Sequence, residues 1–412
     1  MTYVNRRSVL KAGAALATSA LAMPPLLSYG RGEKAVKIGM IDPVTAVYAA
    51  EGDSEISGAR MALDEVNRSG GITGREVELI IEDSAANAGL AQQKAYKLMD
   101  RDQVDMLMGA VSSAVALSVN QAAHDRGKLY MVTGGHADQV TGSECHWNTF
   151  RICTTTWMLA NGLAQTMLRK FGKRWYFITP DYAYGHTIQA AYAKILTKAG
   201  GTVLGNSLTP LGATDFSSFL IAAQASKPDV LMVLVGGGDQ LTLMKQAAQF
   251  GLPQRMPMGG GLSELEVLSA LPAEARRGWW ELEWWWNQPK EPHVIKFVEA
   301  YRGRYNKTPS ARSWFGYAGL HALALGANRA KSVDSRKVAR ALEGMELPPE
   351  VALQPNKIYF RAGDHQLMSN VFPGEALPDG SVPNVFKIAE VVDGDSVALP
   401  VAETSCKLDY PA

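Results

Sequence analysis

Apolar segments of strand length alternate with amphipathic segments of helix length along most of this 412-residue chain. A strand that is apolar on both sides needs cover on both faces of its sheet, and the helices that follow such strands provide it. The alternation therefore predicts βα units around parallel sheets. In the first half of the chain, strands are predicted at 36–42, 76–83, 104–111 and 128–134, and helices at 57–67, 89–102 and 113–127.

The alternation restarts in the middle of the chain, which predicts an α/β protein with two doubly wound lobes. The second set has strands at 174–180, 202–208 and 228–237, and helices at 160–172, 187–201, 216–226 and 240–251. Residues 290–345 are predicted to be mostly helical, and the tail to form short strands and loops. No low-complexity linker separates the lobes, so we expect the chain to cross between them more than once and form a hinge.

The N-terminal stretch predicts export. Arg6 and Arg7 precede an apolar run at 12–27, which is long enough for a signal-peptide core and too short to span a bilayer. The small residues at 20–22 suit a signal peptidase. The segment RRSVLK matches the twin-arginine export pattern, and an ordinary Sec signal is the alternative. Residues 1–30 are therefore interpreted as a signal peptide, and the mature protein as soluble and periplasmic.

Size and charge narrow the class of protein. Roughly 380 residues remain after cleavage, which suggests two domains. Apolar residues make up 47% of the chain and charged residues 20%, as in an ordinary globular protein. The net charge of +1 gives no reason to propose nucleic acid or an anionic membrane surface as a partner.

The three cysteines allow one disulfide in an oxidising compartment. We predict a bond between Cys145 and Cys406, which would hold the C-terminal tail on the body of the protein, with Cys153 left over. Three free buried thiols are the alternative, and spacing alone does not decide between them.

Four segments, taken in order, resemble the periplasmic solute-binding proteins of branched-chain amino-acid-type ABC transporters, the Leu/Ile/Val-binding-protein-like family. They are SGARMALDEVNRSGGITGREVELIIEDSAAN, MGAVSSAVALSV, PDYAYGH and ATDFSSFLIAAQASKPDVLMV. The resemblance implies a periplasmic-binding-protein type I fold, with two Rossmann-like lobes joined by a three-strand hinge and a ligand in the cleft. Lobe one is expected at 36–155 plus 287–360, and lobe two at 156–286 plus 361–412. The implied partners are a small-molecule ligand and ABC permease subunits, and the protein is expected to be a monomer.

Candidate ligand contacts follow the predicted strands of the first lobe, because open α/β sheets bind ligands beyond the carboxyl ends of their strands. Ser112 and Ser113 begin a helix whose first N–H groups are unpaired, a corner suited to a carboxylate. Ser113 could instead merely cap that helix. By resemblance, Gly134 and His136 contact the ligand through the backbone and a side chain. His136 could donate to a carboxylate or a ligand hydroxyl, or be a surface-loop histidine.

Tyrosines are predicted on both rims of the cleft. By resemblance, Tyr184 in the Asp-x-x-Tyr-Gly turn closes over the ligand, although it could simply pack that turn. Tyr48 follows the first strand, where core packing is an alternative role. Gly237 lies at the end of a second-lobe strand and is included as a candidate ligand contact.

The most informative departure from the family pattern lies in the second lobe. Family members that bind amino acids place an acidic residue after a strand, and here alignment puts Gly260 at that position. A buried ammonium group without a partner costs several kcal/mol. An α-amino acid is therefore disfavoured as ligand unless another acid replaces the missing one. Asp239 is the nearest substitute, and a helix N-cap is its equal alternative.

Tryptophans suggest an aromatic pocket. The segment GWWELEWWWNQP carries five of them, and Trp285 in it and Trp157 after the first crossover are expected to line the cleft, unless they pack in the core. With no acidic partner for an amine, such a pocket suits an aromatic acid.

The sequence therefore predicts the solute-binding component of an ABC importer that captures a small carboxylate by hinge closure. An amino-acid-binding protein of the same type and a ligand-sensing partner of a membrane receptor are the alternatives. An exported enzyme is disfavoured because the chain has no Gly-x-Ser-x-Gly elbow, no His-Glu-x-x-His and no Cys/His metal cluster. No cofactor or metal is expected.

Overall fold

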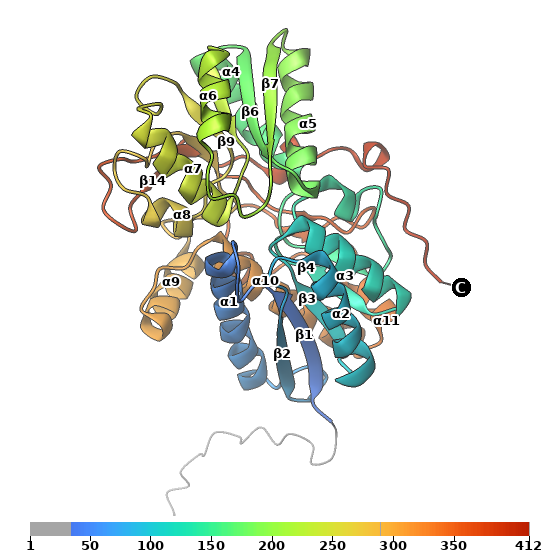
Figure 1. Ribbon diagram of the computed structural model, residues 1–412. Coiled ribbons are helices and arrows are strands. Elements are labelled where there is room, and N and C mark those ends of the chain that lie inside the picture. The colour runs from blue at the N-terminus through green and yellow to red at the C-terminus, as the bar shows by residue number, and fades with distance from the viewer. Residues whose placement is uncertain (1–33, 289, 412) are drawn as a thin grey trace, which may run out of the picture.

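The computed structural model describes residues 34–288 and 290–411, which form two α/β lobes, each built around its own sheet (Figure 1). The predicted signal peptide at 1–30 lies outside the described residues. Among the described helices, none combines the length and apolar character needed to cross a bilayer.

The sheet of the first lobe is entirely parallel, with strand order β2-β1-β3-β4-β5. Its strands are β1 (Val36–Asp42), β2 (Val77–Asp83), β3 (Met106–Gly109), β4 (Leu129–Val132) and β5 (Thr149–Arg151). Alternate residues enter different cores, because successive side chains of a strand point to opposite faces. Met106 and Met108 join one cluster, and Leu107 between them joins the other.

Helices cover both faces of this sheet. On one face lie α1 (Ala49–Arg68), α9 (Pro292–Tyr305), α10 (Ala311–Ala330), α11 (Ser335–Leu342) and the short α12 (Pro349–Ala352). On the other lie α2 (Ala88–Tyr96), which continues into a π-helical turn at Lys97–Arg101, and α3 (Ser113–Asp125).

Helices α1 and α10 cross in direct backbone contact. A Cβ on Gly58 would lie 1.9 Å from the carbonyl oxygen of Ser313, and one on Gly316 would lie 1.9 Å from that of Glu55. Only glycine permits this approach. The crossing brings the first turns of α10 beside the first turns of α1, at the edge of the first lobe that faces the second.

The sheet of the second lobe has the order β14-β13-β10-β9-β8-β6-β7, in which β13 alone runs opposite to the other strands and pairs antiparallel with both β10 and β14. Its strands are β6 (Arg174–Pro180), β7 (Thr202–Thr209), β8 (Val230–Val233), β9 (Met258–Leu262), β10 (Trp279–Glu281), β13 (Gly374–Ala376) and β14 (Phe386–Ile388). On one face lie α4 (Thr156–Phe171) and α5 (Ala183–Lys198), and on the other α6 (Ser217–Ala225), α7 (Gly237–Gln249) and α8 (Leu265–Ala270).

Every strand and helix predicted between residues 36 and 251 is present, and the predicted α/β class is confirmed. The largest difference is α1, which begins at Ala49 rather than at residue 57. Its first turns carry Glu51 and Glu55, both buried. Helices are predicted from an amphipathic pattern in which charged residues face solvent. Buried carboxylates break that pattern, so the first turns of α1 could not be predicted from the sequence.

Three crossovers, at 152–155, at 282–288 with 290–291, and at 369–373, form the hinge between the lobes as predicted, and the C-terminal tail later crosses back to the first lobe. A buried network joins the three crossovers. The Glu283 carboxylate accepts hydrogen bonds from the backbone N–H of Thr154 at 2.5 Å and from its hydroxyl at 2.8 Å. The Gln354 amide donates to the Glu283 carbonyl at 3.0 Å and accepts from the Asn370 N–H at 2.9 Å.

The expected boundaries between the lobes stay a prediction. The packing leads us to propose that one of them, the boundary expected at 360/361, lies later in the chain. The hairpin of β11 (Tyr359–Phe360) and β12 (Leu367–Met368) places Phe360 and Leu367 in the core of the first lobe. We propose that the third crossing to the second lobe begins near residue 369.

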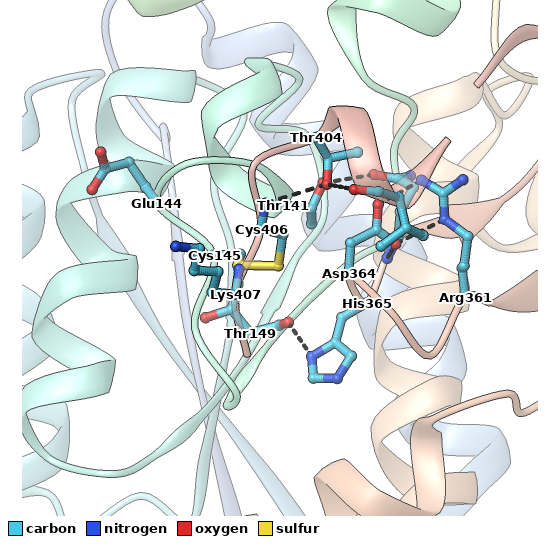
Figure 2. The surroundings of a disulfide bond; sticks show 12 residues. Thr141, Glu144, Cys145, Thr149, Arg361, Asp364, His365, Thr404, Cys406 and Lys407 are labelled. Atoms are coloured by element: carbon cyan, nitrogen blue, oxygen red, sulfur yellow. Dashed lines mark hydrogen bonds and ion pairs between the residues drawn. A yellow bond between two sulfur atoms is a disulfide. The ribbon is translucent and has the colours of Figure 1, made fainter. Parts of the chain in front are cut away.

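The C-terminal tail returns to the first lobe. Helix α13 (Gly394–Val397) still packs on the second lobe, where the Asn161 amide donates to the Val397 carbonyl at 3.1 Å. Beyond it, Cys406 forms a disulfide with Cys145 (Figure 2), which confirms the predicted pairing. The Tyr410 hydroxyl donates to Glu343 at 2.7 Å. Of the three cysteines, all within the described part, Cys153 is free and buried.

This disulfide closes a loop with a sequence separation of 261. Its removal should therefore increase the conformational entropy of the unfolded chain. We expect Cys145→Ser to lower the free energy of unfolding by about 2–4 kcal/mol. Urea denaturation under non-reducing conditions measures this loss in the free energy of unfolding.

Cys406→Ser is the matched control, since it removes the same bond. It should cost as much as Cys145→Ser, and the double variant should cost no more than either. Additive losses, or two alkylated thiols at these positions in the native protein, would contradict the assignment.

Candidate functional site

A small cavity lies between the lobes, at the carboxyl ends of both parallel sheets, where α/β folds bind ligands. Its volume is about 30 Å³, on the scale of a water molecule. The residues that line it are Tyr48, Val111, Ser113, His136 and Arg312 from the first lobe, and Tyr182, Tyr184, Gly236, Gly237, Leu262 and Glu264 from the second. The lobes are therefore closed around it.

Four helices begin at this cavity. Ser113 is the first residue of α3, Tyr184 the second of α5, Gly237 the first of α7, and Arg312 the second of α10. A helix N-terminus carries unpaired N–H groups and the positive end of the helix dipole. Their convergence favours an anionic group in the cavity.

Ser113 does not cap its helix, so the alternative role considered for it does not hold. The N-cap of α3 is Ser112, which makes no capping bond. The Ser113 hydroxyl accepts a hydrogen bond from the Ala137 N–H at 3.0 Å, and it keeps its own proton to donate. Ser112 lies outside the cavity lining, and its buried hydroxyl has no partner among the described residues.

His136 is buried rather than a surface-loop histidine, and Arg151 holds its loop by donating to the carbonyl of Ala137 at 2.7 Å. The His136 Nε2 and the Glu283 carboxylate are 2.5 Å apart. Burial lowers the pKa of His136, which keeps its ring neutral. Burial alone would raise the pKa of Glu283, but its interactions with His136 and Thr154 outweigh this effect and lower it.

An ionised Glu283 requires the proton of His136 on Nε2. In that tautomer Nδ1 is an acceptor. His136 therefore suits a ligand hydroxyl or N–H group, and the suggestion that it donates to a carboxylate loses its support.

Arg312 joins the two lobes. Its Nη1 donates to Glu55 of α1 at 2.9 Å, and its Nε donates to Glu264 of the second lobe at 2.6 Å. Burial would lower the pKa of Arg312, yet these two carboxylates raise it well above its ordinary value. Burial raises the pKa of Glu264, and Arg312 opposes that rise.

Tyrosines also close the lobes on each other. The hydroxyls of Tyr48 and Tyr182 lie 2.7 Å apart across the interface. Gly237, with a φ of 57°, receives the Tyr48 ring: a Cβ there would lie 2.6 Å from the ring. The structure thus brings Tyr48, Tyr184 and Gly237 together with Ser113 and His136.

Three predicted residues lie beside the cavity rather than on it. Gly134 lies under Arg312, and a Cβ there would lie 2.0 Å from Nη1. Gly260 packs in the second lobe, where its carbonyl accepts from Tyr192 at 2.8 Å. Asp239 accepts from the Gly212 N–H at 2.9 Å, and burial raises its pKa to about 6. Asp239 is not the N-cap of α7 either, since Gly236 occupies that position.

The two predicted tryptophans do not line the cavity. Trp157 lies on a separate surface, with the Lys194 ammonium 4.9 Å from its ring centre. Trp285 is in the core of the second lobe, 5.6 Å from the ring of Phe386. Trp285 thus takes the core role that the sequence left open for it, and neither indole is among the residues that line the cavity.

Sequence reasoning missed Tyr182, Glu264, Arg312 and Glu283. Tyr182 stands two residues before Tyr184 in a segment that was recognised, and Glu264 closes the segment PMGGGLSE. An acid does therefore reach the cavity, four residues after Gly260, which removes the main reason for disfavouring an amine-bearing ligand. Arg312 had no local signal, because it is one of two arginines in a long and mostly apolar helix.

The comparisons with known proteins agree with this geometry. The family model described as "Periplasmic binding protein" matches residues 35–381. A Leu/Ile/Val-binding protein homolog 8 from Brucella melitensis is 26% identical over 85% of this chain and 90% of its own. The crystal structure of a periplasmic binding protein from Burkholderia mallei has a TM-score of 0.84 and 30% identity, over 91% of this chain and 99% of its own.

A second solved structure, a branched chain amino acid ABC transporter periplasmic ligand-binding protein from Burkholderia xenovorans LB400, has a TM-score of 0.78 and 25% identity. The match covers 91% of this chain and all of that one. These comparisons confirm the resemblance and the fold predicted from the sequence. By its family match and its fold, this chain belongs to the periplasmic binding protein family.

Proposed function

We propose that this protein is the solute-binding component of an ABC importer and that it captures a small carboxylate-bearing ligand between its lobes. The observation that carries the proposal is the convergence of four helix N-termini, Ser113 and Arg312 on one cavity between two hinged lobes. The similarity to the Burkholderia xenovorans transporter protein supports the link to an ABC permease. The RRSVLK segment supports export by the twin-arginine route.

The ligand's carboxylate is placed at the start of α3. There the Ser113 hydroxyl and the first N–H groups of the helix supply donors without any movement of the chain. Tyr48, Tyr182 and Tyr184 then supply apolar ring faces for the body of the ligand. Three tyrosines thus take the place that the tryptophans were expected to fill, and a flat aromatic acid is one candidate ligand.

Capture requires the lobes to open, because the closed cavity is far smaller than any such ligand. A ligand that first contacts Ser113 and His136 on one lobe gains contacts with Tyr182 and Tyr184 only when the lobes close. Those added contacts shift the population towards the closed form. The closed shape is what a permease would recognise.

An α-amino acid is the second candidate, and Glu264 is the observation that favours it. This carboxyl lies on the cavity wall across from α3. A zwitterion with its carboxylate on Ser113 would direct its ammonium group towards the opposite lobe, where Glu264 provides an acidic partner.

A thermal-shift screen of the mature protein separates the two candidates. The panel holds benzoate- and cinnamate-type acids, branched-chain and aromatic amino acids, and short amides as controls that carry no carboxylate. A ligand at a hundred times its dissociation constant adds about 2.7 kcal/mol of stability. We expect carboxylates to raise the melting temperature and amides to leave it unchanged. Stabilisation by amides alone would contradict the proposed ligand class.

Substitution of the serine at the start of α3 tests the carboxylate position. Ser113→Ala removes one hydrogen bond to a charged group, so we expect affinity for the ligand found in the screen to fall about tenfold or more. Titration calorimetry measures it. Ser112→Ala is the matched control, since this neighbouring serine lies off the cavity. Equal losses in both variants would assign the effect to the fold of the loop instead.

A further inference from the structure

The Arg312–Glu264 pair stands apart from the other ion pairs of the described residues. It alone joins a guanidinium of the first lobe to a carboxylate of the second. Both side chains are almost fully buried, with 5% and 6% of their surface exposed. Glu264 is the N-cap residue of α8, yet its side chain makes no capping bond and reaches Arg312 instead.

Glu55 fixes Arg312 within the first lobe, whatever the second lobe does. One carboxylate oxygen of Glu55 accepts from the Thr133 hydroxyl at 2.5 Å, and the other accepts from Arg312 Nη1. Gly134 leaves the space that the guanidinium fills. These contacts all lie within the first lobe, so Arg312 keeps a carboxylate partner when the lobes separate.

Glu264 accepts from only one of the two donor groups on the edge of the Arg312 guanidinium that faces it. It takes a single hydrogen bond, from Nε, and Nη2 makes no hydrogen bond to the part of the chain that the structure describes. The Nε and Nη2 donors of a guanidinium lie parallel on one edge, and a carboxylate that takes both is held more strongly than one that takes a single bond.

We propose that this edge of Arg312 is the receptor for the ligand's carboxylate, and that Glu264 stands in for that carboxylate as a latch between the lobes. The proposal rests on the proposed function and deepens it. A ligand carboxylate displaces Glu264 from Nε and also takes Nη2. Each carboxylate oxygen of the ligand can accept a second hydrogen bond, and the Ser113 hydroxyl on the same cavity can donate it.

The exchange makes Glu264 a determinant of specificity. A carboxylate without an amine displaces Glu264 and leaves it without a partner in the closed cavity. A ligand that also carries an ammonium group gives the displaced Glu264 a new partner. Glu264 therefore penalises simple acids relative to zwitterions, while Arg312 serves both.

Scattering from the ligand-free protein tests the latch. We expect Glu264→Gln to increase the radius of gyration, because the charged inter-lobe bond is lost. The matched control is Glu266→Gln. The half-buried Glu266 side chain also reaches the first lobe, where it accepts from the Ser310 hydroxyl at 2.5 Å, but that partner is uncharged and a glutamine oxygen can still accept from it. This variant should leave the wild-type radius nearly unchanged. The same radius in all three proteins would overturn the latch.

Binding of two probes, benzoate and leucine, tests the receptor edge. Glu264→Gln should tighten benzoate binding by about tenfold, since the competing charge is removed, and should weaken leucine binding by a similar factor. Arg312→Lys keeps the charge for Glu55 but lacks the edge, and should weaken both probes by about tenfold. Weaker benzoate binding in Glu264→Gln, or unchanged binding in Arg312→Lys, would overturn the assignment.

The two experiments fail separately. If the wild type binds a probe and Arg312→Lys binds it equally well, the receptor edge falls while the carboxylate class of the proposed function stands. The scattering comparison still decides whether Glu264 closes the lobes, because it needs no ligand.

Discussion

The buried carboxylate of Glu283 is the interaction on which the rest of the structure depends. It lies in the second crossover, accepts two hydrogen bonds from Thr154 in the first, and connects through Gln354 to Asn370 in the third. It also accepts from His136, which lines the cavity. The carboxylate thus ties the first two crossovers to the ligand side, and the backbone carbonyl of the same residue connects them to the third. A buried carboxylate is tolerated there because its partners supply the hydrogen bonds that water would provide.

The cleft above this hinge is rich in acid. Asp42, Glu51 and Glu266 each have one buried oxygen with no partner among the described residues. Burial raises the pKa of Asp42 well above its ordinary value and that of Glu51 to about 7. A raised carboxyl pKa means that the folded protein holds the proton more tightly. The stability from Glu51 is therefore greatest at low pH and is lost as the pH rises from about 4.5 to 7.

Local patterns in the sequence were sufficient to predict the helices and strands named above between residues 36 and 251, but only half of the residues of the candidate site. Ser113 was found because it follows a predicted strand, and parallel strands end at a common edge. His136 and Tyr184 were named by the resemblance to the family. The place of Trp285 could not be decided because burial in a core and exposure to a ligand leave the same pattern in a sequence. Arg312 was missed because its neighbours in space, Glu55 and Glu264, are far from it in the chain. Its position depends on the crossing of α1 and α10 at two glycines.

The sequence by itself determined the two α/β lobes and more than one passage between them, because periodicity and chain order carry that information. The number of crossovers came from the family resemblance, and spacing alone left the disulfide pairing open. The tertiary structure alone decided the chemistry of the cleft. Charges from distant segments meet there, and burial, not residue type, sets which of them pair and which hold a proton. An acid four residues from the expected position, facing an arginine from the opposite lobe, changed which ligands the cavity favours.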